Sequence, residues 1–421
     1  MVGKKPTIPI ITRVTAKNFR SLEDVDVKLG PLTVLVGPNA SGKSNVVDVL
    51  RFVADAFRNG LETAIATRHG IGAIRRWSAH GRPYDVDIGL SVEGNEFTAD
   101  YEFSLGSKLK NEYRVKREHC SLRLKNRRGP PLQFEIRDGA LIESTLSIPE
   151  DIVLPFQFEN TASDFVEPMS LGLPLFRRLL FVGRGRLRPT DIGAMMARAL
   201  RNVENHLSNM RFYHIFPNEL REPQKFAEPY PLSEHGENLA SVLREMIKGD
   251  SQYLVDLRNA LSRAVPGVAD FQVTPVGGYL VVKLKHQGAG SNRRGAWFDL
   301  SQESDGTLRI LALLASLFQD PSPSLVAVEE PELTVHPGAL AVLADYLKEA
   351  ALRTQILITT HSPELIDRLP IESLRAVECI DGVTRVGMVA EHQREAVRNE
   401  LFSPGDLHRM EGLQLSAADR Q

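Results

Sequence analysis

Eight consecutive residues near the N-terminal end of the sequence have the types and spacing needed to hold a phosphate group. They follow the pattern G-x-x-x-x-G-K-S and are Gly37, Pro38, Asn39, Ala40, Ser41, Gly42, Lys43 and Ser44. The glycines let backbone N–H groups close on phosphate oxygens, and a following helix adds about half a positive charge at its N-terminus. Lys43 is expected to reach the β- and γ-phosphates, and Ser44 is expected to ligate Mg²⁺. The pattern therefore predicts an ATP-binding loop.

Two adjacent acids, Glu329 and Glu330, end the apolar run 324–328. A carboxylate at the C-terminal end of a buried parallel strand lies at the ligand crevice of an α/β sheet. We expect Glu329 to hold Mg²⁺ through its water shell, and Glu330 to orient or deprotonate the attacking water. An acidic strand-to-loop turn is the plainer alternative, and the phosphate-loop pattern in the same chain weighs against it.

A histidine follows a second apolar run in the C-terminal half. His361 comes directly after residues 355–360, which read as another buried strand. At that position a histidine can donate a hydrogen bond to the γ-phosphate and respond to its loss. A structural histidine is the alternative interpretation.

A second anion-binding pattern precedes the most apolar helix of the sequence. Its residues are Ser304, Asp305, Gly306 and Thr307. A hydroxyl residue and a glycine at a helix N-terminus suit an anion, although an ordinary N-cap without a ligand explains them equally well. Because the chain already has one phosphate loop, a second anion-binding segment suggests that ATP is held between two subunits.

Local patterns predict the elements that position these residues. The β-branched run 32–36 predicts a buried strand before the phosphate loop, and apolar spacing predicts a helix after it that stops at Asn59-Gly60. Residues 8–36 are expected to hold two strands. Residues 84–145 alternate with period two and predict two hairpins, in a small antiparallel sheet separate from the parallel nucleotide-binding sheet.

The remaining segments are predicted more coarsely. We expect a helix over 189–210, helical structure over 238–264, and strands at 271–273 and 279–284 around Gly277-Gly278. The domain boundaries expected from these patterns are 1–145 for the first ATPase lobe with the antiparallel sheet, 146–265 for a mostly helical insertion, 266–395 for the second ATPase lobe, and 396–421 for a C-terminal tail. The apolar residues of that tail could pack on the head or on a partner.

Composition excludes several other classes of protein. The 421 residues carry a net charge of −2, so overall charge implies no polyanionic partner. No apolar stretch approaches the ~20 residues of a membrane span, and we expect no secretory signal, because the apolar run that follows Met1–Pro6 is too short for one. Two cysteines far apart in the sequence predict neither a zinc site nor a disulfide framework. We therefore expect a cytoplasmic protein that acts without a membrane.

In this order, the motifs resemble those of the ABC-type ATPase heads of the SMC, RecF and OLD lineage. Residues 17–22 are similar to its N-terminal motif, 37–44 to its Walker A, and 304–307 to its divergent signature. Residues 329–332 resemble its Walker B, followed by a D-loop at 333–337, and 360–363 match its switch histidine. Gly236–Leu239 resembles small prokaryotic AAA-type members. The resemblance covers roughly residues 8–105 and 235–390.

The resemblance implies a fold and a mechanism. The fold class would be α/β, a P-loop NTPase of ABC-head type with a mainly parallel core sheet, an antiparallel β subdomain and a mostly helical insertion. Two heads would sandwich two ATP molecules with Mg²⁺, in a homodimer or a larger even-numbered assembly. Ser304 and Gly306 of one subunit would meet the γ-phosphate held by Lys43 of the other, and Arg20 would contact ATP. Hydrolysis would release the sandwich.

Departures from the lineage narrow the expected function. The chain has no LSGGQ motif, no long coiled coil and no Q-loop that can be placed, and some 60 residues follow His361, so a Toprim nuclease domain is not expected. Heads of this kind occur in antiphage defence, as in the Septu and PARIS types, where the ATPase works with a separately encoded nuclease or toxin. An ATP-dependent switch or scaffold in defence is our first interpretation. RecF-like DNA repair is the alternative.

Basic residues in the middle of the chain raise the possibility of DNA as a partner. On the second hairpin these include Arg123, Lys125, Arg127 and Arg128, and further arginines lie between 177 and 201. Such clusters suit phosphate contacts, although runs of charge usually form solvated surface. Few aromatic residues lie among them, so base stacking is not indicated.

Overall fold

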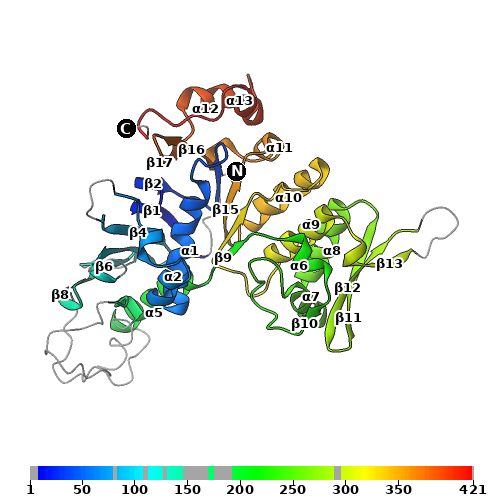
Figure 1. The fold of residues 1–421 in the computed structure, drawn as a ribbon, viewed down its shortest axis with the longest axis horizontal. Helices are drawn as coiled ribbons and strands as arrows, with labels where there is room; N and C mark the ends of the chain where they lie inside the picture. Colours follow the sequence, from blue (N-terminus) through cyan, green and yellow to red (C-terminus); the bar gives the residue numbers. More distant parts are fainter. Residues whose placement is uncertain are drawn as a thin grey trace.

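The computed structural model of the chain describes residues 8–78, 83–107, 112–126, 130–145, 169–174, 192–288 and 295–419. Within these ranges, thirteen strands form one sheet in the order β8-β7-β6-β5-β4-β1-β2-β17-β16-β3-β15-β14-β9 (Figure 1). Their bounds are β1 Ile10–Phe19, β2 Leu22–Lys28, β3 Leu32–Val36, β4 Val86–Glu93, β5 Phe97–Ser107, β6 Tyr113–Leu124, β7 Leu132–Arg137, β8 Ala140–Ser144, β9 Met210–Tyr213, β14 Leu325–Glu329, β15 Gln355–Thr360, β16 Leu374–Ile380 and β17 Val383–Met388.

The parallel part of the sheet consists of β16, β3, β15, β14 and β9. Short apolar runs form these strands because both faces of a parallel sheet are covered, so every position along the strand faces other residues. All six residues of β15 are buried, for example. The strands predicted at 32–36, 324–328 and 355–360 are confirmed.

The antiparallel part consists of β1, β2 and β4–β8. Alternating burial along β4 and β6 confirms the two predicted hairpins. The expectation of a separate sheet is wrong, because β1 pairs with β4 and β2 pairs with β17 through Leu22 and Thr384. The N-terminal hairpin β1–β2 thus joins the two regions, and residues 8–36 hold three strands rather than two.

A smaller sheet lies on the side of the molecule opposite the antiparallel strands β4–β8 (Figure 1). It contains β10 Gln224–Lys225, β11 Val268–Val276, β12 Tyr279–His286 and β13 Ala296–Asp299. The strands predicted around Gly277-Gly278 are confirmed as the β11–β12 hairpin.

Helices cover both sheets, and the expected ones are present. Their bounds are α1 Lys43–Asn59, α2 Leu61–Ala66, α3 Ile71–Ile74, α5 Ile192–Ser208, α6 Pro217–Arg221, α7 Leu239–Gly249, α8 Gln252–Ala264, α9 Asp305–Leu317, α10 Pro337–Ala350, α11 Pro363–Ile366, α12 Glu391–Arg398 and α13 Pro404–Met410, with 3-10 turns η1 Leu300–Gln302 and η2 Ile371–Ser373. Helix α1 ends before Gly60 as predicted. None of the helices in the described ranges combines the length and apolar composition that a membrane span requires. The domain boundaries stay a prediction, although β9, within 146–265, pairs with β14 of the core sheet.

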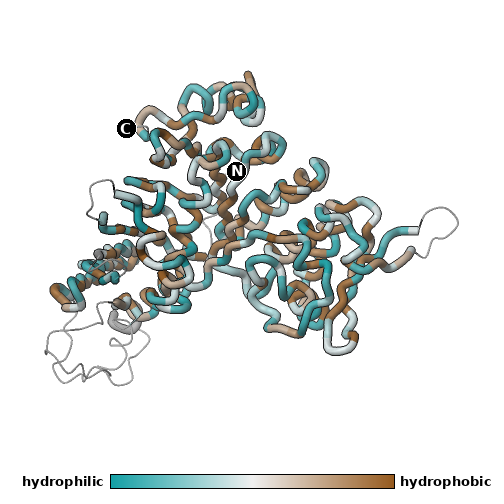
Figure 2. The backbone as a smooth tube through the Cα atoms, in the orientation of Figure 1, coloured by the Kyte–Doolittle hydropathy of each residue, from teal (hydrophilic) through white to brown (hydrophobic). Residues whose placement is uncertain are grey.

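Two hydrophobic clusters hold the structure together. One contains α1 and the antiparallel strands, and the other contains α7–α10 and the opposite face of the parallel strands. Hydrophobic stretches run through these central elements (Figure 2). The C-terminal tail packs on the second cluster through Leu407 and Leu413, which are buried, whereas Leu401, Phe402 and Met410 are exposed.

Candidate nucleotide-binding site

Three neighbouring parallel strands bring the predicted site residues to one edge of the sheet. The order β3-β15-β14 places the phosphate loop, the switch histidine and the paired acids after adjacent strands. Strand register aligns Val36 with Thr360, and Thr359 with Glu329. Segments almost 300 residues apart in the sequence therefore meet where a parallel α/β sheet binds ligands.

The phosphate loop has the backbone that its sequence predicts. Gly42 precedes α1 with a φ of 100°, and no side chain in the described residues caps this helix. Nζ of Lys43 donates to the carbonyl oxygens of Gly37 at 2.8 Å and Pro38 at 2.9 Å, so the loop curls around the ammonium group. Burial lowers the pKa of Lys43, while the charges of Glu330 and Glu332 oppose that shift. The free helix N-terminus and the enclosed lysine suit an anionic ligand.

Strands β16 and β17 press directly against this loop. A Cβ on Gly37 would lie 2.1 Å from the carbonyl oxygen of Val377, and one on Gly42 would lie 2.0 Å from Oγ1 of Thr384. Oγ1 of Thr384 donates to the carbonyl oxygen of Ser41 at 3.0 Å. The same atom lies 2.6 Å from Oγ of Ser21, which in turn accepts from the side chain of Asn45. Thr384 therefore fixes the loop from outside.

Ser44 and Glu329, the two residues predicted to hold Mg²⁺, lie in direct contact. Oγ of Ser44 donates to Oε2 of Glu329 at 2.6 Å. Hydroxyl and carboxylate oxygens are ligands that Mg²⁺ prefers, so these residues fit the predicted ion. A guanidinium also holds Glu329: Arg51 of α1 lies 2.9 Å from its Oε1 and 3.1 Å from Oε1 of Glu234.

Glu330 is held by its backbone, and its side chain stays partly exposed. Its φ is 46°, an uncommon conformation for a residue with a side chain. Its N–H donates to the carbonyl oxygen of Thr359 at 3.0 Å, and its carbonyl oxygen accepts from buried Arg309 at 2.9 Å. Arg309 belongs to α9, so the helix that follows the signature residues contacts the predicted base.

His361 lies beside Glu330 and Glu332. Its Nδ1 is 3.8 Å from Oε1 of Glu330 and 3.4 Å from Oε1 of Glu332. Glu332 is nearly buried and accepts from Oγ1 of Thr360 at 2.7 Å and from the N–H of His361 at 3.0 Å. Glu332 thus fixes the loop that carries the histidine.

Ser304, the first of the signature residues, is the N-cap of α9. Oγ of Ser304 accepts from the N–H of Thr307 at 3.2 Å, and Asp305 pairs with Arg221. Gly306 packs closely on the predicted D-loop, since a Cβ there would lie 2.6 Å from the carbonyl oxygen of Thr334. The cap alone is also what an ordinary helix would show, so a role toward ATP stays a prediction.

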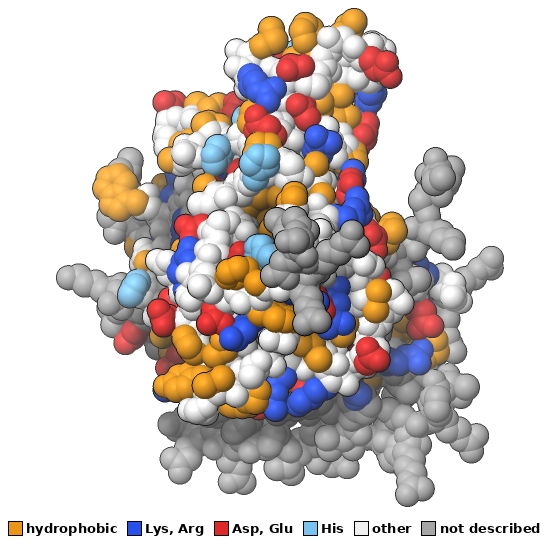
Figure 3. Space-filling model, turned by 90° about the vertical axis from the view of Figure 1, so that its right-hand side faces the viewer, with side chains coloured by type: hydrophobic (Ala, Val, Ile, Leu, Met, Phe, Trp, Pro, Cys, Tyr) orange, Lys and Arg blue, Asp and Glu red, His pale blue; other side chains and the backbone are white. Residues whose placement is uncertain are grey.

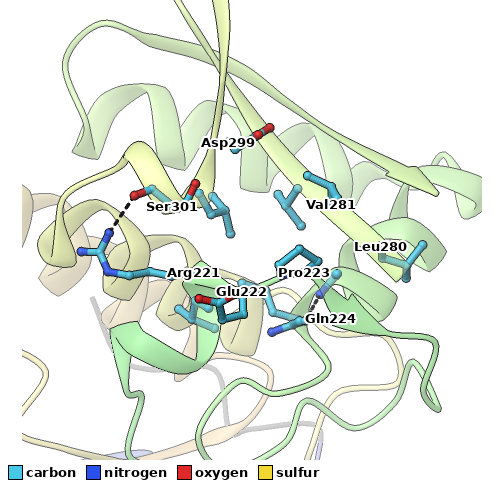
Figure 4. A pocket seen from close by; sticks show the side chains of 13 residues that line it. Arg221, Glu222, Pro223, Gln224, Leu280, Val281, Asp299 and Ser301 are labelled. Carbon is cyan, nitrogen blue, oxygen red and sulfur yellow. Dashed lines mark hydrogen bonds between the residues drawn. The ribbon is translucent and has the colours of Figure 1, made fainter. Parts of the chain in front are cut away.

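A pocket lies next to the signature segment. It has a volume of about 200 Å³ and lies between α6, β10, β12 and η1 (Figure 4). Arg221 at its rim donates to the carbonyl oxygen of Ser301 at 3.2 Å. The residues that line this pocket do not include the phosphate loop, the paired acids or His361, so it is distinct from the candidate nucleotide site.

Arg20 contacts the helix that follows the phosphate loop. Its guanidinium lies 3.0 Å from Oδ2 of Asp48, which also pairs with Arg68 at 3.1 Å. Asp48 is one turn beyond Ser44 on α1, so Arg20 lies near the site, and its predicted contact with ATP stays a prediction.

The basic hairpin is largely neutralised where it is described. Lys125 lies 2.6 Å from Glu93, and Lys116 lies 2.5 Å from Asp85. Arg123 is exposed on β6. Arg127 and Arg128 lie outside the described residues, as do the arginines from 177 to 188. Figure 3 shows the side of the molecule away from this hairpin, and basic and acidic side chains are intermixed there.

Three further residues shape the site and belong to none of the predicted motifs, namely Arg51, Arg309 and Thr384. Arg51 and Thr384 contact residues 278 and 343 positions away in the sequence, whereas Arg309 contacts Glu330, 21 positions away. Arg51 carried one local signal, because it lies seven positions after Ser44 and therefore on the same face of α1.

Comparisons with known proteins agree with this geometry. The chain is 48% identical over 44 residues to an OLD nuclease of Thermus scotoductus (10% of this chain, 8% of that protein). It is 46% identical over 55 residues to the chromosome partition protein Smc of Desulfitobacterium hafniense (12% and 5%). The chain thus spans less than a tenth of the length of these curated relatives.

A solved structure shows the same fold. A crystal structure of an Smc head bound to the C-terminal winged-helix domain of ScpA is 15% identical, with a TM-score of 0.52, covering 91% of this chain and 99% of that chain. The α/β fold of an SMC-like ATPase head, with a large mixed sheet, is therefore established. A family model described as "AAA domain, putative AbiEii toxin, Type IV TA system" matches residues 32–148 and 157–367. The chain belongs to this AAA family of SMC- and OLD-like ABC-type ATPase heads.

Proposed function

We propose that this chain binds Mg-ATP and hydrolyses it. The observation that carries the proposal is the meeting of Lys43, Ser44, the paired acids and His361 after three adjacent parallel strands. The phosphate loop supplies backbone N–H groups and an enclosed lysine, and Ser44 and Glu329 would hold Mg²⁺. When bound, the ion would neutralise charge on the phosphates.

Glu330 and His361 would carry out the remaining steps of ATP hydrolysis. Glu330, held by its backbone with a partly exposed carboxylate, orients the attacking water and accepts its proton. His361, whose Nδ1 lies 3.8 Å from Oε1 of Glu330, would contact the γ-phosphate. Fixed donors aimed at developing charge are usually the largest contribution to such catalysis.

Two substitutions test the site. Glu330→Gln keeps the shape of the side chain but removes its basicity, so turnover should fall by at least about a hundredfold while ATP still binds. Lys43→Ala should weaken ATP binding itself. Glu349→Gln, an exposed change on α10, is the matched control. Phosphate release and titration calorimetry measure the two effects, and an unchanged rate in Glu330→Gln would remove Glu330 from its role.

We further propose that two copies form an ATP sandwich, with Ser304 and Gly306 of one copy meeting the γ-phosphate bound by the other. The cap on α9 and its link to Glu330 through Arg309 support this. Light scattering of Glu330→Gln should show a mass increase on adding Mg-ATP. A monomer mass with saturating ATP would contradict the sandwich, whereas a dimer without ATP would mean that other surfaces hold it.

For the biological role, we propose antiphage defence together with a separately encoded effector. The family description, which names a toxin of a toxin–antitoxin system, favours this over DNA repair, and the ion pairs on the basic hairpin favour it as well. Cells that carry the chain and its genomic neighbours should resist phage, and Lys43→Ala should abolish that resistance. Salt-dependent DNA binding that is lost when Arg123 and Lys125 are neutralised would instead support the RecF-like alternative.

A further inference from the structure

Arg221, the last residue of α6, holds the segment that carries the signature residues. Its Nη1 donates to the carbonyl oxygen of Ser301 at 3.2 Å (Figure 4) and to that of Glu303 at 2.9 Å, and its Nη2 pairs with Oδ1 of Asp305. These acceptors lie on both sides of Ser304, so one guanidinium fixes the path of the chain into α9. A planar guanidinium serves several acceptors at once, whereas all donors of a lysine share one nitrogen.

Two further contacts hold the same segment from other directions. The side chain of Glu303 is almost fully buried and lies 2.7 Å from Nε2 of His286 on β12. Gly306 lies against the predicted D-loop, where the carbonyl oxygen of Thr334 leaves no room for a Cβ. Contacts from α6, β12 and the D-loop therefore fix the signature segment within a single copy of the chain.

Arg221 also changes the charge of this segment. The carboxylate of Asp305 is 49% exposed and belongs to the residues predicted to meet a γ-phosphate. Two negative groups close to each other repel, and a cation paired with one of them offsets that repulsion. Arg221 supplies this cation, so an acidic residue can lie in a segment that is predicted to face an anion.

The helix that carries Arg221 is tied to the paired acids at its other end. Arg309 donates to the carbonyl oxygen of Ile215 at 3.0 Å and to that of Glu330 at 2.9 Å. Helix α6 begins two residues after Ile215 and ends at Arg221. One short helix therefore connects the backbone beside Glu330 with the signature segment.

We propose that Arg221 is a positioning residue for the ATP sandwich, because it sets the signature segment and neutralises Asp305, so that the segment can receive the γ-phosphate held by the partner copy. The inference rests on the proposed function, and specifically on the sandwich. A displacement of about 1 Å at a site of this kind can cost about a hundredfold in rate. Loss of Arg221 should therefore impair assembly and turnover and leave nucleotide binding by a single head intact.

The test is Arg221→Met, which keeps an apolar stem and removes the guanidinium. In a Glu330→Gln background with saturating Mg-ATP, a light-scattering dilution series should show dimerisation weakened at least about tenfold. With Glu330 present, turnover should also fall at least about tenfold. The affinity for ADP, measured by calorimetry, should not change, because ADP lacks the γ-phosphate that the partner copy contacts. Lys248→Met, which removes an exposed cation on α7, is the matched control and should change none of these quantities.

A second variant separates the proposed role from a general loss of structure. Adding Asp305→Asn to Arg221→Met removes the unpaired negative charge without restoring the hydrogen bonds to the two carbonyl oxygens. The double variant should therefore recover part of the lost dimerisation. An arginine that only supported the fold would give no recovery, and that result would refute the neutralising role of Arg221.

The outcomes distinguish this inference from the proposed function. A parent protein that binds no nucleotide would refute the proposed function. A parent that hydrolyses ATP while Glu330→Gln stays monomeric with Mg-ATP would refute the sandwich and, with it, the role of Arg221. If Arg221→Met dimerises and turns over like the parent, the role of Arg221 alone is refuted. A loss of ADP affinity as large as the loss of dimerisation would also refute it, because Arg221 would then support the whole head.

Discussion

The most informative single change outside the predicted motifs is Thr384→Val. The threonine is almost fully buried on β17, and its hydroxyl connects three segments that the sequence separates. It donates to the carbonyl oxygen of Ser41 at 3.0 Å and lies 2.6 Å from Oγ of Ser21. Because its proton goes to Ser41, Ser21 is the donor in the second contact. Valine keeps the volume of threonine and removes both hydrogen bonds.

The expected cost follows from those two contacts. Each buried hydrogen bond contributes about 1 kcal/mol net, and a buried carbonyl left without its donor costs about 1–3 kcal/mol. Thr384→Val should therefore lower the free energy of unfolding by about 2–3 kcal/mol. Since the loop must hold one conformation to bind phosphate, we also expect ATP to bind about tenfold more weakly, a loss of about 1.4 kcal/mol.

The prediction is tested by urea unfolding and ATP titration of the parent protein, Thr384→Val and Thr384→Ser. Thr384→Ser keeps the hydroxyl and loses one methyl group, so it should retain ATP affinity near the parent value. If Thr384→Val matched the parent in both urea midpoint and ATP affinity, the proposed anchor would be refuted. If the serine variant lost as much stability and ATP affinity as valine, packing of the methyl group against Gly42 would be needed in addition to the hydrogen bonds.

Three further predictions concern other parts of the molecule. Burial raises the pKa of Glu118 from 4.5 to about 7. Its contribution to the free energy of unfolding is therefore fully present below about pH 4.5 and is lost as pH rises through 7, by about 3 kcal/mol in total. Urea unfolding at pH 5 and pH 8 should show this loss of stability in the parent protein and not in Glu118→Gln. Gly306→Ala should lower stability by about 1 kcal/mol in the same assay, because the clash with the carbonyl oxygen of Thr334 outweighs the higher helix propensity of alanine. Arg51 lies 2.9 Å from Glu329 and competes with Mg²⁺ for that carboxylate. Arg51→Met removes this positive charge, so the Mg²⁺ concentration for half-maximal ATP binding should fall about fivefold in ATP titrations at graded Mg²⁺. A rise in that concentration would contradict the competition.

Several features of the site could be predicted because their signals are local. The strand, glycine loop and helix from 32 to 59 are contiguous, and so are the apolar runs that end in Glu329 and precede His361. Buried parallel strands read as apolar runs, and their C-terminal ends share one edge of the sheet, so these residues could be expected to meet. The two hairpins between 84 and 145 were equally predictable from their alternating pattern.

The tertiary structure decided what no local pattern encodes. Pairing of β2 with β17 joins the antiparallel and parallel regions into one sheet. The alternating pattern of a strand shows which of its faces is buried, but it does not show which strand pairs with its edge. Thr384 and Arg309 reach the site from a strand and a helix whose own sequence patterns indicate only burial. Their roles depend on which distant backbone lies opposite, and that is fixed by packing of the whole chain. The sequence by itself thus indicated which residues gather at the sheet edge, and the tertiary structure determined which distant residues hold them in place.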